Sequence, residues 1–226
     1  LEFSKGKKSF DKVVVNADYA YTQGDLLYRQ VPRYKYSCSV YLLYLGLKKK
    51  IQGVSHHNLF FAKDLNKNLS DIFSNRAIPV NDASFYVHAP TVTDHSLAPE
   101  GKEIFYILVP VPNLENQELD FSGKEADLKK NVFKRINEQL GINLEELIEA
   151  EHSFYPVDFI KRYNIKNGAT FGLSHNLFQS AFFRPGNMDK KIKGLYYVGA
   201  STQPGGGLPV VIAGSGITAD LIVKNP

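Results

Sequence analysis

Cysteine is almost absent from this sequence, which holds one, Cys38, among 226 residues. A single thiol cannot form a disulfide within the chain, and this fits a reducing compartment. With 43% hydrophobic and 22% charged residues, a chain of this length can bury a sizeable core without disulfides or a metal. Long apolar runs are missing too. None approaches the ~18 residues that span a membrane, and the first residues do not resemble a signal peptide.

A strong excess of one charge is also missing. Lysine and arginine number 27 against 23 aspartates and glutamates, which gives a net charge of +4. This excess is too small and too evenly spread to indicate a nucleic-acid partner. The short basic run Lys48-Lys49-Lys50, beside Leu45 and Leu47, fits either a solvated turn or a contact with anionic lipid head groups.

The common nucleotide and metal motifs are absent as well. The glycine-rich run at 204–207 is not followed by Gly-Lys-Ser/Thr, and no Gly-x-Gly-x-x-Gly opens a βαβ unit. His56 and His57 are adjacent, and adjacent residues of a strand point to opposite faces. The other histidines, at 88, 95, 152 and 175, show no ligand spacing, so we expect no metal site.

The hydrophobic patterns predict a mixed α/β chain. The continuous run Val13-Val14-Val15 is typical of a strand buried on both faces. Apolar residues every four positions, followed by Gly141, predict a helix that ends there: Leu128, Val132, Ile136 and Leu140. A second helix at 64–73 is expected to use an apolar face of Leu65, Leu69, Ile72 and Phe73.

The remaining expected elements follow from alternation and from turn residues. A hairpin with its turn at Lys5-Gly6-Lys7 opens the chain, and residues 144–152 read as helix or strand; 168–183 gives no clear pattern. Strands are expected at 10–15, 36–47, 59–61, 84–88, 104–109 and 194–199, and a closing helix at 209–223. Because α/β elements lie at both ends and separated strands lie between them, we expect a split domain with an insertion.

The segment 195–217 carries the most chemical information. A strand runs into Gly199-Ala200-Ser201-Thr202, then into a glycine-rich loop, and then into a helix that begins near Pro209. Small residues and a helix N-terminus at the end of a strand let a flat or anionic cofactor approach the main chain. Any tight strand–loop–helix crossing also uses glycine, so the pattern alone leaves both interpretations open.

At this segment the chain resembles a known family. Tyr197-Val198-Gly199-Ala200-Ser201-Thr202-Gln203-Pro204-Gly205-Gly206-Gly207-Leu208-Pro209 is similar to the C-terminal signature of the phytoene-type carotenoid desaturases, G-A-S/G-T-H-P-G-x-G-x-P. Within the family the similarity is strongest to the bacterial 4,4'-diapophytoene (dehydrosqualene) desaturases. Further matching stretches lie at 14–18, 36–39, 97–102, 171–173 and 182–185. The resemblance covers essentially the whole chain and implies the C-terminal part of such an enzyme.

Two departures from the family are visible. Gln203 stands where the family usually has histidine, and a glutamine cannot gain a charge near neutral pH. The family's dinucleotide fingerprint, which would precede this segment, is not in the sequence. We therefore expect the chain to be an incomplete and inactive portion of an FAD-dependent enzyme.

The resemblance implies a two-domain fold and a set of cofactor contacts. The expected layout is a Rossmann-like FAD-binding domain split between 1–30 and 184–226, with a β-rich substrate-binding domain at 31–183 inserted in it. Asn16 and Ala17 would lie near the cofactor, and Arg184 would either pair with a phosphate or cap a turn. The residues expected to line the ribityl and pyrophosphate region are Gly199, Ala200 and Ser201; those expected at the isoalloxazine ring are Gly207, Leu208, Pro209, Val210 and Val211.

The implied activity is desaturation of a linear carotenoid precursor such as 4,4'-diapophytoene, with FAD as cofactor. The alternatives are a phytoene desaturase, a carotenoid end-group oxygenase of the same family, and a non-catalytic fragment. The expected partners are a long polyisoprenoid hydrocarbon and a membrane surface, with the enzyme attached peripherally to the inner face of the cell membrane in the cytoplasm. No residue of the sequence is identified as a general base.

Overall fold

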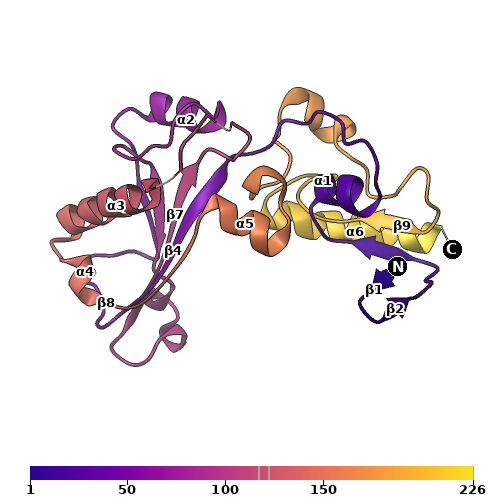
Figure 1. Cartoon of the computed structure of the whole chain (residues 1–226). Coiled ribbons are helices and arrows are strands. Elements are labelled where there is room, and N and C mark those ends of the chain that lie inside the picture. Colours follow the sequence, from indigo (N-terminus) through magenta and orange to yellow (C-terminus); the bar gives the residue numbers. More distant parts are fainter. Residues whose placement is uncertain (117, 122, 226) are drawn as a thin grey trace. The chain divides into compact units, whose positions relative to one another are not determined.

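The computed structural model describes residues 1–116, 118–121 and 123–225, and it divides into two compact units. Leu1–Ser37 and Ile160–Pro226 together form the first, which we call the terminal unit. Cys38–Phe159 forms the second, the middle unit (Figure 1). Each unit contains helices and strands, so the chain is mixed α/β as expected. None of the helices in the described part is long and apolar enough to cross a membrane.

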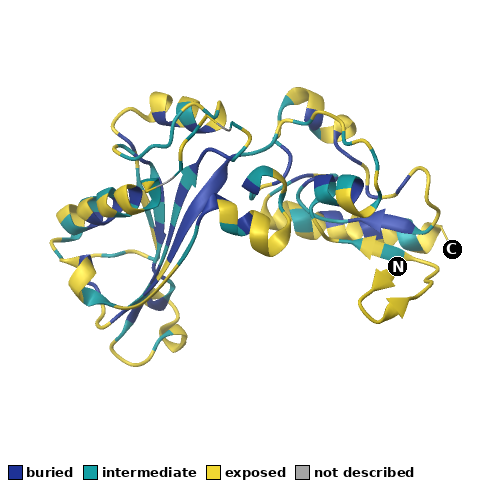
Figure 2. Ribbon diagram, viewed as in Figure 1, coloured by how far each residue is buried: buried dark blue, intermediate teal, exposed yellow. Residues whose placement is uncertain are grey.

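The middle unit is built on a five-stranded antiparallel sheet in the order β5-β6-β7-β4-β8. Its strands are β4 Ser39–Leu47, β5 His57–Phe60, β6 Phe85–His88, β7 Glu103–Val111 and β8 Ile148–Phe154. The longest pairing joins β4 to β7 over nine residues, from Ser39 opposite Val111 to Leu47 opposite Glu103. Figure 2 shows that β4, the second strand from one edge, is buried along most of its length.

Helix α3, Lys124–Leu140, packs its apolar face into the same core as β4, β6 and β7. Leu128, Val132 and Ile136 are buried, as the four-residue spacing predicts. Gly141 follows in a left-handed conformation and its N–H donates to the carbonyl of Asn137, which ends the helix as predicted. The short helix α4, Leu144–Leu147, leads into β8, so the ambiguous segment 144–152 is helix first and strand afterwards.

Helix α2, Leu65–Phe73, is present, but its predicted apolar face is wrong. Of that face only Ile72 is buried; Leu65, Leu69 and Phe73 are exposed. The inward residue beside Ile72 is Asn68, whose amide donates to the carbonyl of Asp82 and accepts from the N–H of Ser84. A polar contact therefore sets the rotation of this helix, and apolar spacing does not reveal it.

The terminal unit contains one parallel strand pair. β3, Val13–Val15, runs beside β9, Leu195–Tyr197, with Val15 opposite Tyr197. β9 is buried, but the expectation that β3 is buried on both faces is wrong, because Val14 is 49% exposed. In the described part of the chain this sheet has two strands.

The other elements of the terminal unit are short apart from α6. They are β1 Glu2–Phe3, β2 Gly6–Lys7, α1 Tyr19–Tyr21, a π-helical turn at Thr22–Leu26 and α6 Leu208–Lys224. α5, Pro156–Tyr163, crosses from the middle unit into the terminal unit. β1 and β2 form the expected hairpin, but its turn is at Ser4 and Lys5, one residue earlier than predicted.

Residues 31–37 and 160–183 pack with the terminal unit, whereas the sequence analysis assigned them to the inserted domain at 31–183. Tyr36 forms a β-bridge with Leu173, and the N–H of Ser174 donates to the carbonyl of Lys35 at 3.0 Å. The unpatterned part of this segment consists of short 3₁₀ turns at Lys166–Gly168, Leu177–Gln179 and Ala181–Phe183. Such turns have no extended apolar period, so no hydrophobic pattern predicts where this segment packs.

His56 and His57 do not point to opposite faces of one strand, as their adjacency in the sequence predicted. His56 lies just before β5, and only His57 belongs to the strand. The two rings do not diverge to opposite faces: their centroids are 4.3 Å apart.

Candidate functional site

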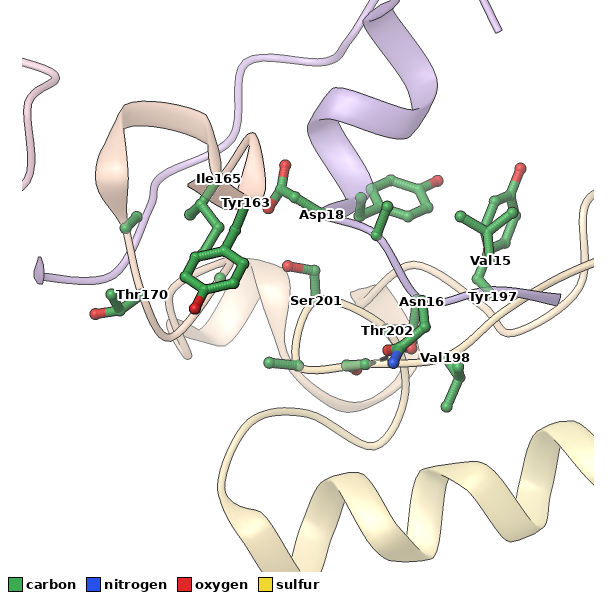
Figure 3. Close-up of a pocket in the computed structure, with 16 residues that line it drawn as sticks. Val15, Asn16, Asp18, Tyr163, Ile165, Thr170, Tyr197, Val198, Ser201 and Thr202 are labelled. Atoms are coloured by element: carbon green, nitrogen blue, oxygen red, sulfur yellow. Dashed lines mark hydrogen bonds between the residues drawn. The ribbon is translucent and has the colours of Figure 1, made fainter. Parts of the chain in front are cut away.

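A cavity of about 310 Å³ lies in the terminal unit, where the two parallel strands end (Figure 3). β3 leads into Asn16, and β9 leads into Val198, so both carboxyl ends open on the same space. Ligands in α/β sheets bind outside the carboxyl ends of parallel strands, because the loops there expose main-chain groups. The lining residues are Val15, Asn16, Ala17, Asp18, Tyr19, Tyr163, Ile165, Ala169, Thr170, Gly172, Tyr197, Val198, Gly199, Ala200, Ser201 and Thr202.

The structure gathers five of the predicted cofactor residues around this cavity and leaves five outside its wall. Asn16 and Ala17 come from the end of β3, and Gly199, Ala200 and Ser201 from the end of β9. The other five, at 207–211, form the start of α6, where Gly207 is the N-cap residue with φ +104°. A Cβ built on Gly207 would meet its nearest heavy atom at 3.9 Å, so the space beside this glycine is open.

Asp18 supplies the carboxyl group among the described lining residues, and the sequence analysis did not identify it. Its side chain caps α1 by accepting from the N–H of Tyr21 at 2.9 Å. Burial raises the pKa of Asp18 above its ordinary value, although the hydrogen bond from Tyr21 opposes this. An aspartate directly before a helical turn is a recognisable capping signal.

The wall opposite the strand ends comes from residues 163–172, which sequence reasoning also missed. Tyr163, Ile165 and Thr170 project from this segment, and Figure 3 shows them beside Asp18 and Ser201. Gly172 is in the left-handed region, with φ +71°, and its Cβ would lie 2.4 Å from the Ser201 hydroxyl oxygen. The two walls therefore pack main chain against side chain at a distance that only glycine allows.

Comparisons with known proteins place the chain in a clear sequence context. No family model matches it. A zeta-carotene-forming phytoene desaturase of Myxococcus xanthus is 41% identical over 95% of this chain and 42% of the relative. 4,4'-Diapophytoene desaturases of Staphylococcus haemolyticus and Methylomonas sp. are each 36% identical, over 96% and 95% of this chain and 46% and 43% of the relatives. Over nearly its whole length the chain is similar to these carotenoid desaturases.

The chain spans less than half the length of the curated proteins it matches. Among solved structures, an oxidoreductase from Methanosarcina mazei is 15% identical, with a TM-score of 0.47, over 94% of this chain and 43% of that one. A likeness of that size does not establish a common fold.

Arg184 holds the loop that carries the desaturase signature. Its side chain is buried and donates to five main-chain carbonyls. They belong to Leu173, Ser174, Gln179, Ala200 and Thr202. A guanidinium has five N–H groups, so these bonds leave none for a cofactor phosphate. Of the two roles weighed from the sequence, the structure therefore favours holding the turn.

His175 supports the glycine loop of the same signature. Its Nε2 accepts from the N–H of Gly206 at 3.0 Å, so the ring proton belongs on Nδ1. Burial, and then the nearby charge of Arg184, lower the pKa of His175, which keeps the ring neutral at neutral pH. Gly205 has φ +141°, and its Cβ would lie 2.5 Å from the same nitrogen. The ring packs where the loop has no side chain.

Gln203, at the position where the desaturases usually have histidine, has a structural role here. Its amide nitrogen donates to the carbonyls of Ala181 and Arg184 at 3.1 and 3.4 Å. Its own N–H donates to the carbonyl of Pro185 at 3.0 Å. The neutral side-chain amide makes the first two contacts and the main-chain N–H makes the third, so this position needs no protonatable group to hold the loop.

A buried ionic network fixes β9 below the cavity. Arg29 donates to both carboxylate oxygens of Asp189, at 2.5 and 3.1 Å, and the Tyr197 hydroxyl donates to the same carboxylate at 2.5 Å. Gln23 donates to the Tyr197 hydroxyl at 3.0 Å. Burial alone would raise the pKa of Asp189, but the hydrogen bonds from Arg29 and Tyr197 outweigh it and hold that pKa well below its usual range. The network ties the π-helical turn to the strand that opens into the cavity.

We predict that Asp189→Asn lowers the free energy of unfolding by about 1–3 kcal/mol at pH 7, because it removes a charge-assisted bidentate contact. A depressed folded-state pKa contributes stability above the unfolded value, near 3.9, and loses it as the pH falls toward the folded value. The difference between wild type and variant should therefore be constant from pH 7 to about pH 5 and shrink below pH 4.

Urea unfolding across this pH range measures the difference. Asp220→Asn is the matched control in the same unit, because Asp220 and Lys224 form an exposed pair 3.9 Å apart that should contribute little. Equal stability of Asp189→Asn and wild type at pH 7 would contradict the role given to this network.

Proposed function

We propose that this chain is part of an FAD-dependent desaturase that dehydrogenates a linear carotenoid precursor. The observation that carries the proposal is 34–41% identity to carotenoid desaturases over at least 95% of the chain. The position of the signature residues Gly199, Ala200 and Ser201 at the carboxyl end of β9 supports it. In this proposal the terminal unit contributes to FAD binding and the middle unit to substrate binding.

The residues present fit one part of a flavin dinucleotide. Small side chains at Ala17, Gly199 and Ala200 leave main-chain groups accessible beside the cavity. A volume of about 310 Å³ is at the low end for a ligand site, so the cavity matches one portion of the cofactor. Asn16, Ala17 and the 199–201 loop would hold it there, and the start of α6 would offer its N–H groups to negative charge.

When bound, FAD supplies the hydride acceptor for removing hydrogen from adjacent carbons of the substrate. The protein's contribution is to orient a hydrocarbon that has almost no hydrogen-bonding groups and to keep water away from it. Asp18, whose pKa is raised by burial, supplies the carboxyl group among the described lining residues. We assign it no catalytic role, because nothing fixes the position of a substrate carbon near it.

Two substrate classes fit the similarities. The 36% identity to diapophytoene desaturases favours the thirty-carbon precursor named in the sequence analysis. The 41% identity to a zeta-carotene-forming phytoene desaturase favours a forty-carbon one. We propose 4,4'-diapophytoene as the substrate and phytoene as the second candidate.

The function is tested in bacterial cells that accumulate either diapophytoene or phytoene and that express the complete desaturase carrying this sequence. New visible absorption bands from a lengthened polyene in the diapophytoene cells support the proposal. Bands in the phytoene cells alone support the second candidate. Failure of a flavin-loaded, folded enzyme to change either hydrocarbon would overturn the proposed function.

A glycine variant tests the placement of the cofactor in the same enzyme. We predict that Gly207→Val lowers the bound flavin per protein several-fold, because a branched side chain would fill the open space beside the helix N-terminus. Gly101→Val is the matched control: Gly101 also has a positive φ, +77°, and open space around it, but it belongs to the middle unit. Flavin content that is equal in the two variants would show that the cofactor does not approach Gly207.

We also propose that the enzyme attaches peripherally to the inner face of the cell membrane, where its hydrocarbon substrate is dissolved. The apolar residues first considered beside the lysine run do not support this, because Leu45 and Leu47 are buried in the core. A different group does: Leu177, Phe178, Phe182 and Phe183 are 63–87% exposed and close to one another in the 3₁₀ turns of the terminal unit. Exposed aromatic side chains of this kind insert at the lipid interface.

Vesicle sedimentation tests the attachment. We predict that the chain pellets with anionic vesicles at low salt and is partly released as salt screens its basic residues. Phe178→Ser with Phe182→Ser should weaken vesicle binding about 10-fold or more, because two large apolar groups no longer enter the lipid. Phe73→Ser, at an exposed phenylalanine of the middle unit, is the control. A folded wild-type chain that stays in the supernatant at low salt would contradict the attachment.

A further inference from the structure

Three histidines of the middle unit lie together at the edge of its sheet. His56 precedes β5, His57 is the first residue of β5, and His88 is the last residue of β6. His57 pairs directly with His88 across the two strands, and the N–H of Ala89 donates to the carbonyl of His56 at 3.0 Å. The main chain therefore holds all three residues in place, although 31 positions separate His57 from His88 in the sequence.

The imidazole rings converge on one point. A ring nitrogen of each histidine lies within 4.8 Å of one from each of the other two. The Nε2 atoms of His56 and His88 are 2.8 Å apart. Two nitrogens bound to one tetrahedral Zn²⁺ at about 2.0–2.1 Å are roughly 3.3 Å apart, so a small rotation of the side chains would admit the ion.

Neighbouring hydroxyl groups orient two of the rings. Nδ1 of His56 lies 2.6 Å from the Thr93 hydroxyl oxygen, and that hydroxyl donates its own proton to the carbonyl of Pro90 at 3.3 Å. Thr93 must then accept from Nδ1, which leaves a lone pair on the Nε2 of His56. Nδ1 of His57 lies 2.6 Å from the Tyr86 hydroxyl oxygen. A hydrogen-bond partner on the second ring nitrogen is the arrangement found around metal-binding histidines.

We infer that His56, His57 and His88 form a binding site for a divalent transition-metal ion, with Zn²⁺ the ion that fits best. Neutral imidazoles favour Zn²⁺ and its neighbours over Ca²⁺ or Mg²⁺, which prefer oxygen ligands. Three histidines leave one tetrahedral position for water, and the exposure of His57 gives solvent access to it. The bound ion would join the edge strand β5 to β6.

Metal titration of the tag-free, chelator-treated chain tests the site. Zn²⁺ competed against a chromophoric chelator should bind with one-to-one stoichiometry, and Co²⁺ should give the intense visible bands of tetrahedral coordination. His57→Ala and His88→Ala should each weaken Zn²⁺ binding at least about 10-fold and abolish the Co²⁺ bands, because each removes one ligand.

His152→Ala is the matched control, since His152 is an exposed histidine on β8 of the same sheet. It should bind Zn²⁺ as the wild type does. His57 is exposed at the start of an edge strand, so its substitution leaves the core intact, and circular dichroism verifies the fold of each variant. Absence of saturable binding in the wild type, or equal affinity in wild type and His57→Ala, would overturn the site.

Discussion

The buried guanidinium of Arg184 is the contact on which the cavity depends. Its donors reach the carbonyls of two separate segments, Leu173–Gln179 and Ala200–Thr202. A buried charge is costly unless hydrogen bonds replace its hydration, and here five carbonyl oxygens do so. The loop after β9 and the opposite wall are thereby fixed to each other through one side chain. Loss of Arg184 would leave several buried carbonyls unpaired at once.

Other close contacts also hold the walls of the cavity together. Gly172 lets Ser201 approach the opposite wall, and His175 fills the space left by Gly205. Below them, Asp189 and Arg29 hold β9 through the hydroxyl of Tyr197. Of the signature residues, Gly199, Ala200 and Ser201 line the cavity, and Gln203, Gly205 and Gly206 are held by contacts beside it. A rigid cradle of main-chain groups is what a flavin needs more than a reactive side chain.

The sequence predicted those elements whose apolar spacing alone determines their packing. α3 and the long pair β4 and β7 are examples, because Leu128, Val132 and Ile136 and the alternation of β7 all face one core. It failed where polar contacts decide. Asn68 sets the rotation of α2, and the carbonyls bound by Arg184 place residues 173–179, and neither effect has a hydrophobic period. The exposure of Val14 depends on what covers that face of the strand, which a run of valines does not encode.

The candidate site shows the same division. The signature predicted Gly199, Ala200 and Ser201 at the site, and the matching stretch at 14–18 predicted Asn16 and Ala17. Asp18 and the wall at 163–172 were missed, because that wall is far away in sequence and carries no motif. The three histidines were missed for a related reason: His57 and His88 meet only through the register of β5 and β6.

The central claim is that the carboxyl ends of β3 and β9 hold the flavin, and an NMR titration of this chain with FAD tests it most directly. Amide spectra detect weak binding, which is what a part of the cofactor site should show. The account predicts concentration-dependent shifts for the amides of Ala17, Gly199, Ala200 and Ser201, with little change in the middle unit. Shifts confined to other residues, or none at millimolar FAD, would contradict it.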